Sequence, residues 1–313
     1  MADKKNSITV FAPATVGNLA CGFDSMGLAI NKPGDVVHLV KNNSGKLLIK
    51  EITGDDGRLS KKANENTASV AISAFLKAYK IKQGFDIYLE KQMPLGSGLG
   101  SSAASAVAGV YAAYLLSGLK LHRQDLIRFA MEGEKVACGS AHADNVAPCM
   151  LGGIILVRSN ALLEVISLPS PEKLYITVVH PHVEVLTKDA RAVLRREVPL
   201  PAAVQQWSNT GALVAGLFTS DYTLIGKSTV DLIAEPYRAS LIPGFHEVKK
   251  AALKNNALAC SISGSGPSMF AFCKGQSTAK KVAAAMSEAF RKIKISSDIY
   301  ISRVNTTGVT TIK

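Results

Sequence analysis

The chain has 313 residues, 47% hydrophobic and 19% charged, so it can fold as one large domain or two ordinary ones with a full core. Its formal net charge is +12, but the lysines are dispersed and no aromatic and basic cluster accompanies them, which argues against a nucleic-acid partner and suits small anionic substrates. No run of 18 apolar residues is present and the first residues lack an apolar signal core, so we expect no membrane span and no signal peptide.

The first half contains short strands and two amphipathic helices. Strands are predicted over 8–11, 35–41 and 46–52, and the last two flank a turn signal, Asn42-Asn43-Ser44-Gly45, so we expect them to pair. Apolar residues recur with helical spacing over 67–79, and a second helix is predicted over 121–138. Alternating residues over 85–90 predict a strand that enters a glycine-rich loop, and 152–157 reads as another strand.

The second half follows a looser, proline-containing stretch near residue 170, and we place the domains at 1–165 and 166–313. A strand is predicted over 174–179, then helices over 187–194, 203–219, 224–233 and 244–255. Strands at 260–262 and 269–272 flank a glycine-rich connection, and a helix over 278–293 and a strand over 299–304 follow. Strands and helices do not alternate regularly, which indicates an α+β fold.

The five cysteines are odd in number, scattered and without a CxxC pair. This pattern argues against a disulfide framework or a structural zinc site. It favours reduced thiols, and we therefore predict a cytoplasmic location. The residues are Cys21, Cys138, Cys149, Cys260 and Cys273.

A loop of glycine and serine precedes a helix of small residues. It comprises Pro94, Leu95, Gly96, Ser97, Gly98, Leu99, Gly100, Ser101, Ser102, Ala103 and Ala104. Its glycines allow tight turns close to a ligand, and its serines stand at the predicted helix start, where free N–H groups and the helix dipole favour an anion. No lysine follows Gly100, so the loop is not a P-loop, and its spacing does not match the dinucleotide fingerprint. The alternatives at this point are phosphate binding and an ordinary glycine-rich turn.

Two further clusters of glycine and polar residues lie at 13–24 and 261–268. In order and content, the three clusters resemble the GHMP kinase superfamily over nearly the whole chain, and 94–104 matches its second motif in full. The resemblance implies a two-domain α+β GHMP kinase fold. Its N-terminal domain would be ribosomal-protein-S5-domain-2-like and its C-terminal domain ferredoxin-like.

Within the superfamily the chain is most similar to homoserine kinases, which implies ATP-dependent phosphorylation of the side-chain hydroxyl of L-homoserine in threonine biosynthesis, with Mg²⁺, by a homodimer. One departure is visible, because the usual Ala-Asn-Leu-Gly is Gly17-Asn18-Leu19-Ala20 here. Alternatives are a kinase of the mevalonate, sugar or shikimate type, a non-catalytic relative and an RNA-associated protein. Four segments carry the similarity: Asn18 with Gly22-Phe23-Asp24, His142 to Pro148, Thr187 to Arg191, and Glu235 to Arg238 with Leu241-Ile242-Pro243.

The resemblance assigns Ser102 and Glu134 to the metal ion. Mg²⁺ prefers a few protein oxygens and retains waters, which suits a hydroxyl and a carboxylate. Spacing alone would favour a solvated helix carboxylate for Glu134, beside Lys135. The family match, with Glu134 eight residues before His142, reverses that interpretation.

The acceptor would be held by the residues that match the family motifs. An arginine is the planar donor suited to a carboxylate, so Arg191 and Arg238 are candidates for the substrate carboxylate. Asp24 can pair with the ammonium group, and Asn18 can orient the hydroxyl. Gly264, in the third cluster, would shape the site through backbone contacts.

His142, Asp144 and Asn145 complete the predicted catalytic group, next to the acceptor. Several related kinases carry an aspartate base where this chain has Asn145, and an amide cannot accept a proton at neutral pH. The resemblance therefore implies that no side-chain base is obligatory and that phosphate or water receives the hydroxyl proton. Asp144 is then expected to orient the substrate.

Overall fold

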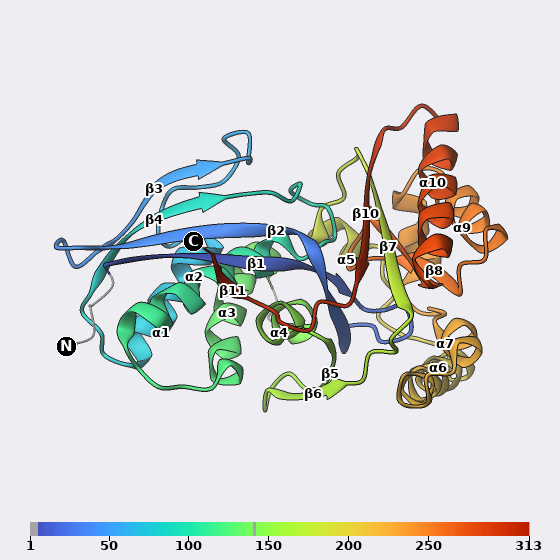
Figure 1. Cartoon of the computed structure of the whole chain (residues 1–313), viewed down its shortest axis with the longest axis horizontal. Helices are drawn as coiled ribbons and strands as arrows, with labels where there is room; N and C mark the ends of the chain where they lie inside the picture. The colour runs from blue at the N-terminus through green and yellow to red at the C-terminus, as the bar shows by residue number, and fades with distance from the viewer. Residues whose placement is uncertain (1–5, 140–141, 313) are drawn as a thin grey trace.

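The computed structural model describes residues 6–139 and 142–312 (Figure 1). The first part of the chain forms β1 (Ser7–Gly17), β2 (Met26–Asn42), β3 (Leu47–Thr53), α1 (Thr67–Ala78), β4 (Gly84–Glu90), α2 (Ser101–Ser117), α3 (Arg123–Cys138), α4 (Ala143–Leu151), β5 (Ile154–Ser159) and β6 (Glu164–Leu168). The second part forms β7 (Leu174–Pro181), α5 (Thr187–Ala192), α6 (Leu200–Thr219), α7 (Tyr222–Ser228), α8 (Glu235–Arg238), a 3₁₀ turn (Ala239–Leu241), α9 (Phe245–Lys254), β8 (Ala259–Ile262), β9 (Met269–Lys274), α10 (Gln276–Lys292), β10 (Ser297–Arg303) and β11 (Thr310–Ile312).

The first sheet has the strand order β11-β1-β2-β4-β3, with β5 and β6 attached through β2. Helices α1 to α4 lie on the same side of it (Figure 1). The predicted pairing of 35–41 with 46–52 is wrong, because β4 lies between these strands. Ile87 is opposite Leu39 of β2 in antiparallel register and opposite Ile49 of β3 in parallel register. The turn signal fixed the chain reversal, but the crossover through α1 brings β4 between the two strands.

Helix α2 lies at the centre of the first half. Its sequence is rich in alanine, and nearly all of its residues are buried, including Val107 and Val110. Small side chains let α1 and α3 approach it closely, as at Gly109, where a Cβ would lie 3.0 Å from the Ala68 carbonyl oxygen. The helix is therefore rigidly placed, and its N-terminus holds the glycine-rich loop in a fixed position.

The second sheet is antiparallel, with the order β10-β7-β9-β8, and α9 and α10 cover one of its faces (Figure 1). The third glycine cluster connects β8 to β9, as the sequence predicted. The last strand, β11, returns to pair with β1. The boundary proposed at residue 165 falls within β6 and stays a prediction. Among the described residues, no helix is long and apolar enough to cross a membrane.

One helix, α4, was not predicted, and one predicted helix is too long. The helix predicted over 224–233 ends at Ser228. The Ser228 hydroxyl donates to the Leu224 carbonyl oxygen, and the Thr229 hydroxyl donates to the Ile225 carbonyl oxygen. The Asp231 carboxylate then accepts hydrogen bonds from the N–H groups of residues 233, 234 and 235 and so starts α8. Side-chain bonds to the backbone thus compete with helix continuation.

Candidate active site

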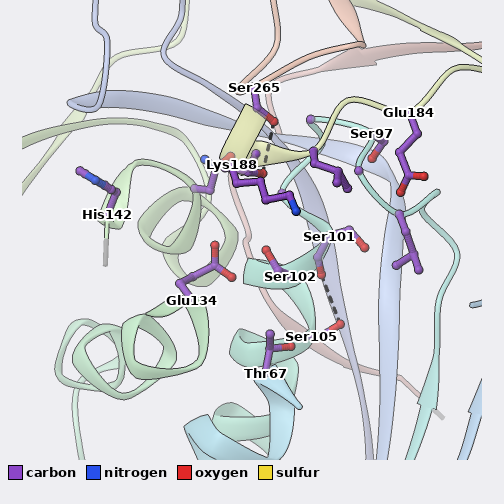
Figure 2. Close-up of a pocket in the computed structure, with 18 of the residues that line it drawn as sticks. Thr67, Ser97, Ser101, Ser102, Ser105, Glu134, His142, Glu184, Lys188 and Ser265 are labelled. Atoms are coloured by element: carbon purple, nitrogen blue, oxygen red, sulfur yellow. Dashed lines mark hydrogen bonds between the residues drawn. The ribbon is translucent and has the colours of Figure 1, made fainter. Parts of the chain in front are cut away.

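A cavity of about 530 Å³ lies between the glycine-rich loop, the start of α2, helices α3 to α5 and the β8–β9 connection (Figure 2). Sixteen of the predicted site residues line it, from segments distant in sequence. They are Asn18, Asp24, Leu95, Gly96, Ser97, Gly98, Gly100, Ser101, Ser102, Glu134, His142, Asp144, Asn145, Arg191, Arg238 and Gly264. The other four, Pro94, Leu99, Ala103 and Ala104, do not line it.

The phosphate-loop prediction rests on three glycines with left-handed backbone. Gly96, Gly98 and Gly100 have φ values of 66°, 75° and 70°. A Cβ at Gly100 would lie 2.1 Å from the Thr15 hydroxyl oxygen, so only glycine fits there. Helix α2 begins at Ser101 without a side-chain cap, which leaves its first N–H groups for an anion. The Ser97 hydroxyl is buried on the cavity wall without a hydrogen-bond partner among the described residues.

The third glycine cluster joins the other two through hydrogen bonds to backbone carbonyl oxygens. The Ser263 hydroxyl donates to the Gly98 carbonyl oxygen at 2.8 Å. The Gly264 N–H donates to the Gly17 carbonyl oxygen at 3.2 Å, and the Asn18 amide donates to the Gly264 carbonyl oxygen at 2.9 Å. The cluster therefore fixes the glycine-rich loop relative to the segment that carries Asn18 and Asp24.

Asp24 and Arg191 form a bidentate ion pair on the cavity wall. Both N–O distances are 3.1 Å, and the two side chains are 24% and 32% exposed. The His142 Nε2 atom lies 3.8 Å from the same carboxylate. Burial lowers the pKa of His142, opposed by Asp24, which favours a neutral imidazole.

Arg238 is held more firmly than Arg191. It is 3% exposed, its Nε donates to the Ala190 carbonyl oxygen and its Nη1 to that of Gly264, each at 2.9 Å. Its guanidinium carbon lies 5.1 Å from the centre of the Phe23 ring. Burial, with a contribution from Arg191, lowers the pKa of Arg238 from its ordinary value, although an arginine stays charged at neutral pH.

Asp144 is almost completely buried and lies beside Asn145. The Asn145 amide donates to the Asp144 carboxylate at 3.2 Å, and the Thr15 hydroxyl donates to Asn145 Oδ1 at 2.7 Å. Burial raises the pKa of Asp144 to about 7, and the charges of Asp24 and Glu134 add to the increase. A carboxylate with this pKa can accept a proton near neutral pH. Asp144 is therefore a candidate general base, contrary to the prediction that no side-chain base is obligatory.

Glu134 of α3 and Ser102 of α2 point into the same part of the cavity (Figure 2). Glu134 is 8% exposed, so its carboxylate is directed at the cavity rather than at bulk solvent. Within the described part of the chain, no cluster of three or more metal-binding side chains exists. One carboxylate and one hydroxyl fit Mg²⁺, which takes its remaining ligands from phosphates and waters.

Several cavity residues were not assigned a role from the sequence. Thr187 and Lys188 stand in a family-matched segment, and Lys91 precedes the glycine-rich loop. Their positions in the sequence could have indicated that they line the site. Arg58 and Glu184 pair at 3.0 Å at the cavity wall, 126 residues apart, and nothing in the sequence indicates their contact.

The fold and this cavity define a GHMP-type small-molecule kinase, and the comparisons agree. The family model of the GHMP kinase N-terminal domain matches residues 66–153, and the model of the GHMP kinase C-terminal domain matches residues 213–292. The chain is 51% identical to a homoserine kinase from Chlorobium phaeobacteroides (strain BS1) over 318 residues, which covers 98% of this chain and 99% of the relative.

Solved structures give the same result. A crystal structure of homoserine kinase from Cytophaga hutchinsonii matches with a TM-score of 0.97 and 56% identity, covering 100% of this chain and 99% of the other. A mevalonate kinase structure, at 13% identity and a TM-score of 0.71, shares the fold alone. The chain belongs to the homoserine kinase family. The predicted α+β GHMP kinase fold is confirmed, and membership of a kinase family implies the use of ATP.

Proposed function

We propose that this chain transfers the γ-phosphoryl group of ATP to the side-chain hydroxyl of L-homoserine and forms O-phospho-L-homoserine for threonine biosynthesis. The observation that carries the proposal is the Asp24–Arg191 ion pair, with Arg238 on the same cavity wall. An α-amino acid carries one ammonium and one carboxylate, so its charges complement those of this pair.

Binding of such a zwitterion keeps every charge compensated. The ammonium group would bind Asp24, and the carboxylate would bind Arg191 and Arg238 by charge-assisted hydrogen bonds. Asp24 and Arg191 are partly buried, so leaving either charge without a partner would be costly. Mevalonate offers a carboxylate to the arginines but no ammonium group to Asp24, and a sugar offers neither charge. The pair therefore favours an amino acid over the other acceptors of the superfamily.

The nucleotide phosphates fit the other end of the cavity, at the start of α2. Ser102 and Glu134 would hold Mg²⁺, which supplies charge neutralisation to the phosphates when bound. Phosphoryl transfer depends mainly on positioning and charge stabilisation, and the rigid glycine-rich loop provides the former. Asn18 stays a predicted hydroxyl-orienting residue, although its side chain already bonds the Gly264 carbonyl oxygen and the Asp24 N–H.

The substrate assignment is tested by measuring ADP release with L-homoserine, mevalonate, galactose and shikimate under identical conditions. We expect a kcat/KM for homoserine that exceeds each of the others by orders of magnitude. Faster turnover of any other acceptor would refute the proposal. The homodimer and the cytoplasmic location stay predictions, and light scattering of the purified protein tests the first.

A further inference from the structure

The segment that carries Asn18 and Asp24 has a strained backbone. Asn18, Leu19 and Ala20 have φ values of 71°, 44° and 61°, and Asp24 has 53°. Left-handed backbone costs about 1–2 kcal/mol for most residues with a Cβ and less for Asn and Asp, so Leu19 and Ala20 carry most of the strain. Such a conformation persists only where the surrounding structure holds it.

Two side chains of α6 hold this segment through one backbone atom. The Cys21 carbonyl oxygen accepts a hydrogen bond from the Gln206 amide at 3.1 Å and from the Thr210 hydroxyl at 2.8 Å. Gln206 is 6% exposed, so these bonds are shielded from water. Cys21 lies only three residues before Asp24, and its position therefore limits where the Asp24 carboxylate can lie.

Gln206 also binds the segment that begins α8. Its amide donates to the Asp231 carboxylate at 3.2 Å, and its Oε1 accepts from the Leu232 N–H at 2.9 Å. Asp231 in turn accepts the N–H groups of residues 233 to 235 at 2.8–2.9 Å, at the start of the helix that ends at Arg238. One buried amide thus connects the Asp24 segment to the Arg238 helix.

The sequence of α6 supports a specific role for its polar residues. None of its 20 residues is charged. Its polar Gln206 and Asn209 face inward, while the aromatic Trp207 and Phe218 are 58% and 63% exposed. Hydrophobic burial alone would favour the opposite orientation, so the inward amides are present for the hydrogen bonds that they make.

We propose that Gln206 is a positioning residue that sets the spacing between Asp24 and Arg238 and so determines specificity for an α-amino-acid acceptor. This inference rests on the proposed function. Loss of the Gln206 amide would weaken the connection between the strained segment and α8 and would impair recognition of a zwitterion. ATP binding should change little, because the Gln206 amide bonds neither the glycine-rich loop nor the third glycine cluster, which holds that loop through the Ser263–Gly98 hydrogen bond.

The test compares Gln206→Met, which keeps the side-chain volume and removes the hydrogen bonds, with Gln205→Met on the exposed face of the same helix. Kinetics with homoserine and ATP are combined with inhibition by 4-hydroxybutanoate and 3-aminopropan-1-ol, which lack the ammonium and the carboxylate, respectively. For Gln206→Met we expect KM for homoserine to rise about tenfold or more, and selectivity over the two analogues to fall about tenfold, since displacing Asp24 or Arg238 would cost the substrate one hydrogen bond and weaken binding by about this factor. The KM of Gln206→Met for ATP should match that of wild type. The Gln205→Met enzyme should match wild type in all of these measurements.

A lower melting temperature with unchanged homoserine KM and unchanged selectivity would show that Gln206 only stabilises the fold, and would overturn the inference. If Gln206→Met does not fold, the inference is tested with Thr210→Val and Thr210→Ser, because the Thr210 hydroxyl donates to the same Cys21 carbonyl oxygen. The valine variant should raise KM for homoserine and the serine variant should restore it, whereas a wild-type KM in both would overturn the inference. A wild-type protein inactive with homoserine would refute the proposed function and this inference together, whereas an active wild type with unaffected variants refutes the inference alone.

Discussion

Lys91 and Asp35 form a buried ion pair beneath the first turn of α2, with side chains that are 2% and 0% exposed. The Lys91 ammonium also donates to the Ser101 carbonyl oxygen at 3.0 Å and to the Ser105 hydroxyl at 2.7 Å. The pair therefore attaches the start of α2 to β2 and to the end of β4. It stabilises the position of the residues that the nucleotide would contact.

Replacing Lys91 by methionine should destabilise the protein by about 3–5 kcal/mol, because Asp35 would remain buried without its counter-charge. The free energy of unfolding, measured by urea denaturation, checks this. The double variant Lys91→Met with Asp35→Leu should recover part of the loss, since removing both charges avoids the uncompensated carboxylate. A single variant within 1 kcal/mol of wild type would contradict the prediction.

Arg191→Gln should reduce kcat/KM for homoserine about tenfold to a hundredfold, the effect of losing a charge-assisted hydrogen bond of about 1.5–3 kcal/mol. KM for ATP should change little. Arg196→Gln is the matched control, because Arg196 does not line the cavity. Arg238→Ala should lower kcat/KM similarly, with a larger loss of stability because the buried Ala190 carbonyl oxygen loses its side-chain donor and Gly264 loses one of two. Wild-type homoserine kinetics in Arg191→Gln would remove it from the acceptor site.

Glu134→Gln keeps the shape of the side chain and removes its charge, so it should lower kcat and raise the Mg²⁺ concentration needed for half-maximal activity. Homoserine binding without nucleotide, measured by calorimetry, should persist. Glu132→Gln on the exposed face of α3 serves as the control. An unchanged Mg²⁺ requirement would exclude Glu134 as a metal ligand.

Asp144 should make the protein less stable as the pH rises. Its pKa is about 7 in the folded state against an ordinary value of 3.8, so between these values the folded state retains a proton that the unfolded state has lost. Its contribution is fully favourable below about pH 4, declines as the pH rises to about 7 and levels off above that. Asp144→Asn should therefore gain stability relative to wild type over this interval. Denaturation at several pH values checks the difference, and a difference that does not vary with pH would contradict it.

The pH–rate profile of the chemical step distinguishes the two roles of Asp144. If no side-chain base is obligatory, Asp144→Asn should mainly raise KM for homoserine, and Asn145→Ala should slow the reaction without a new pH dependence. If Asp144 is the base, the wild type should show an acid limb near pH 7 that disappears in Asp144→Asn, with a rate loss of about 10²–10⁴-fold. The second result would refute the base-free prediction.

The sequence by itself was sufficient for the α+β class and, through its resemblance to the GHMP kinases, for most segments that form the cavity. Local patterns carried part of this information, above all the glycines of the loop at 94–104 and the small residues of the helix that follows it. Gly96, Gly98 and Gly100 were identified because only glycine adopts this conformation without strain. Such patterns depend on residues that are neighbours in the chain, so they can be recognised without knowledge of tertiary contacts.

Contacts between distant segments were decided only by the tertiary structure. The placement of β4 between β2 and β3, the Lys91–Asp35 pair and the Arg58–Glu184 pair join residues that no local pattern relates. The raised pKa of Asp144 has the same origin, because burial and distant charges cause it. Gln206 is the clearest example, since a glutamine on an uncharged helix gives no sign that it connects Cys21 to Asp231. Packing of the whole chain determines such neighbours, and with them the electrostatics and geometry of the site.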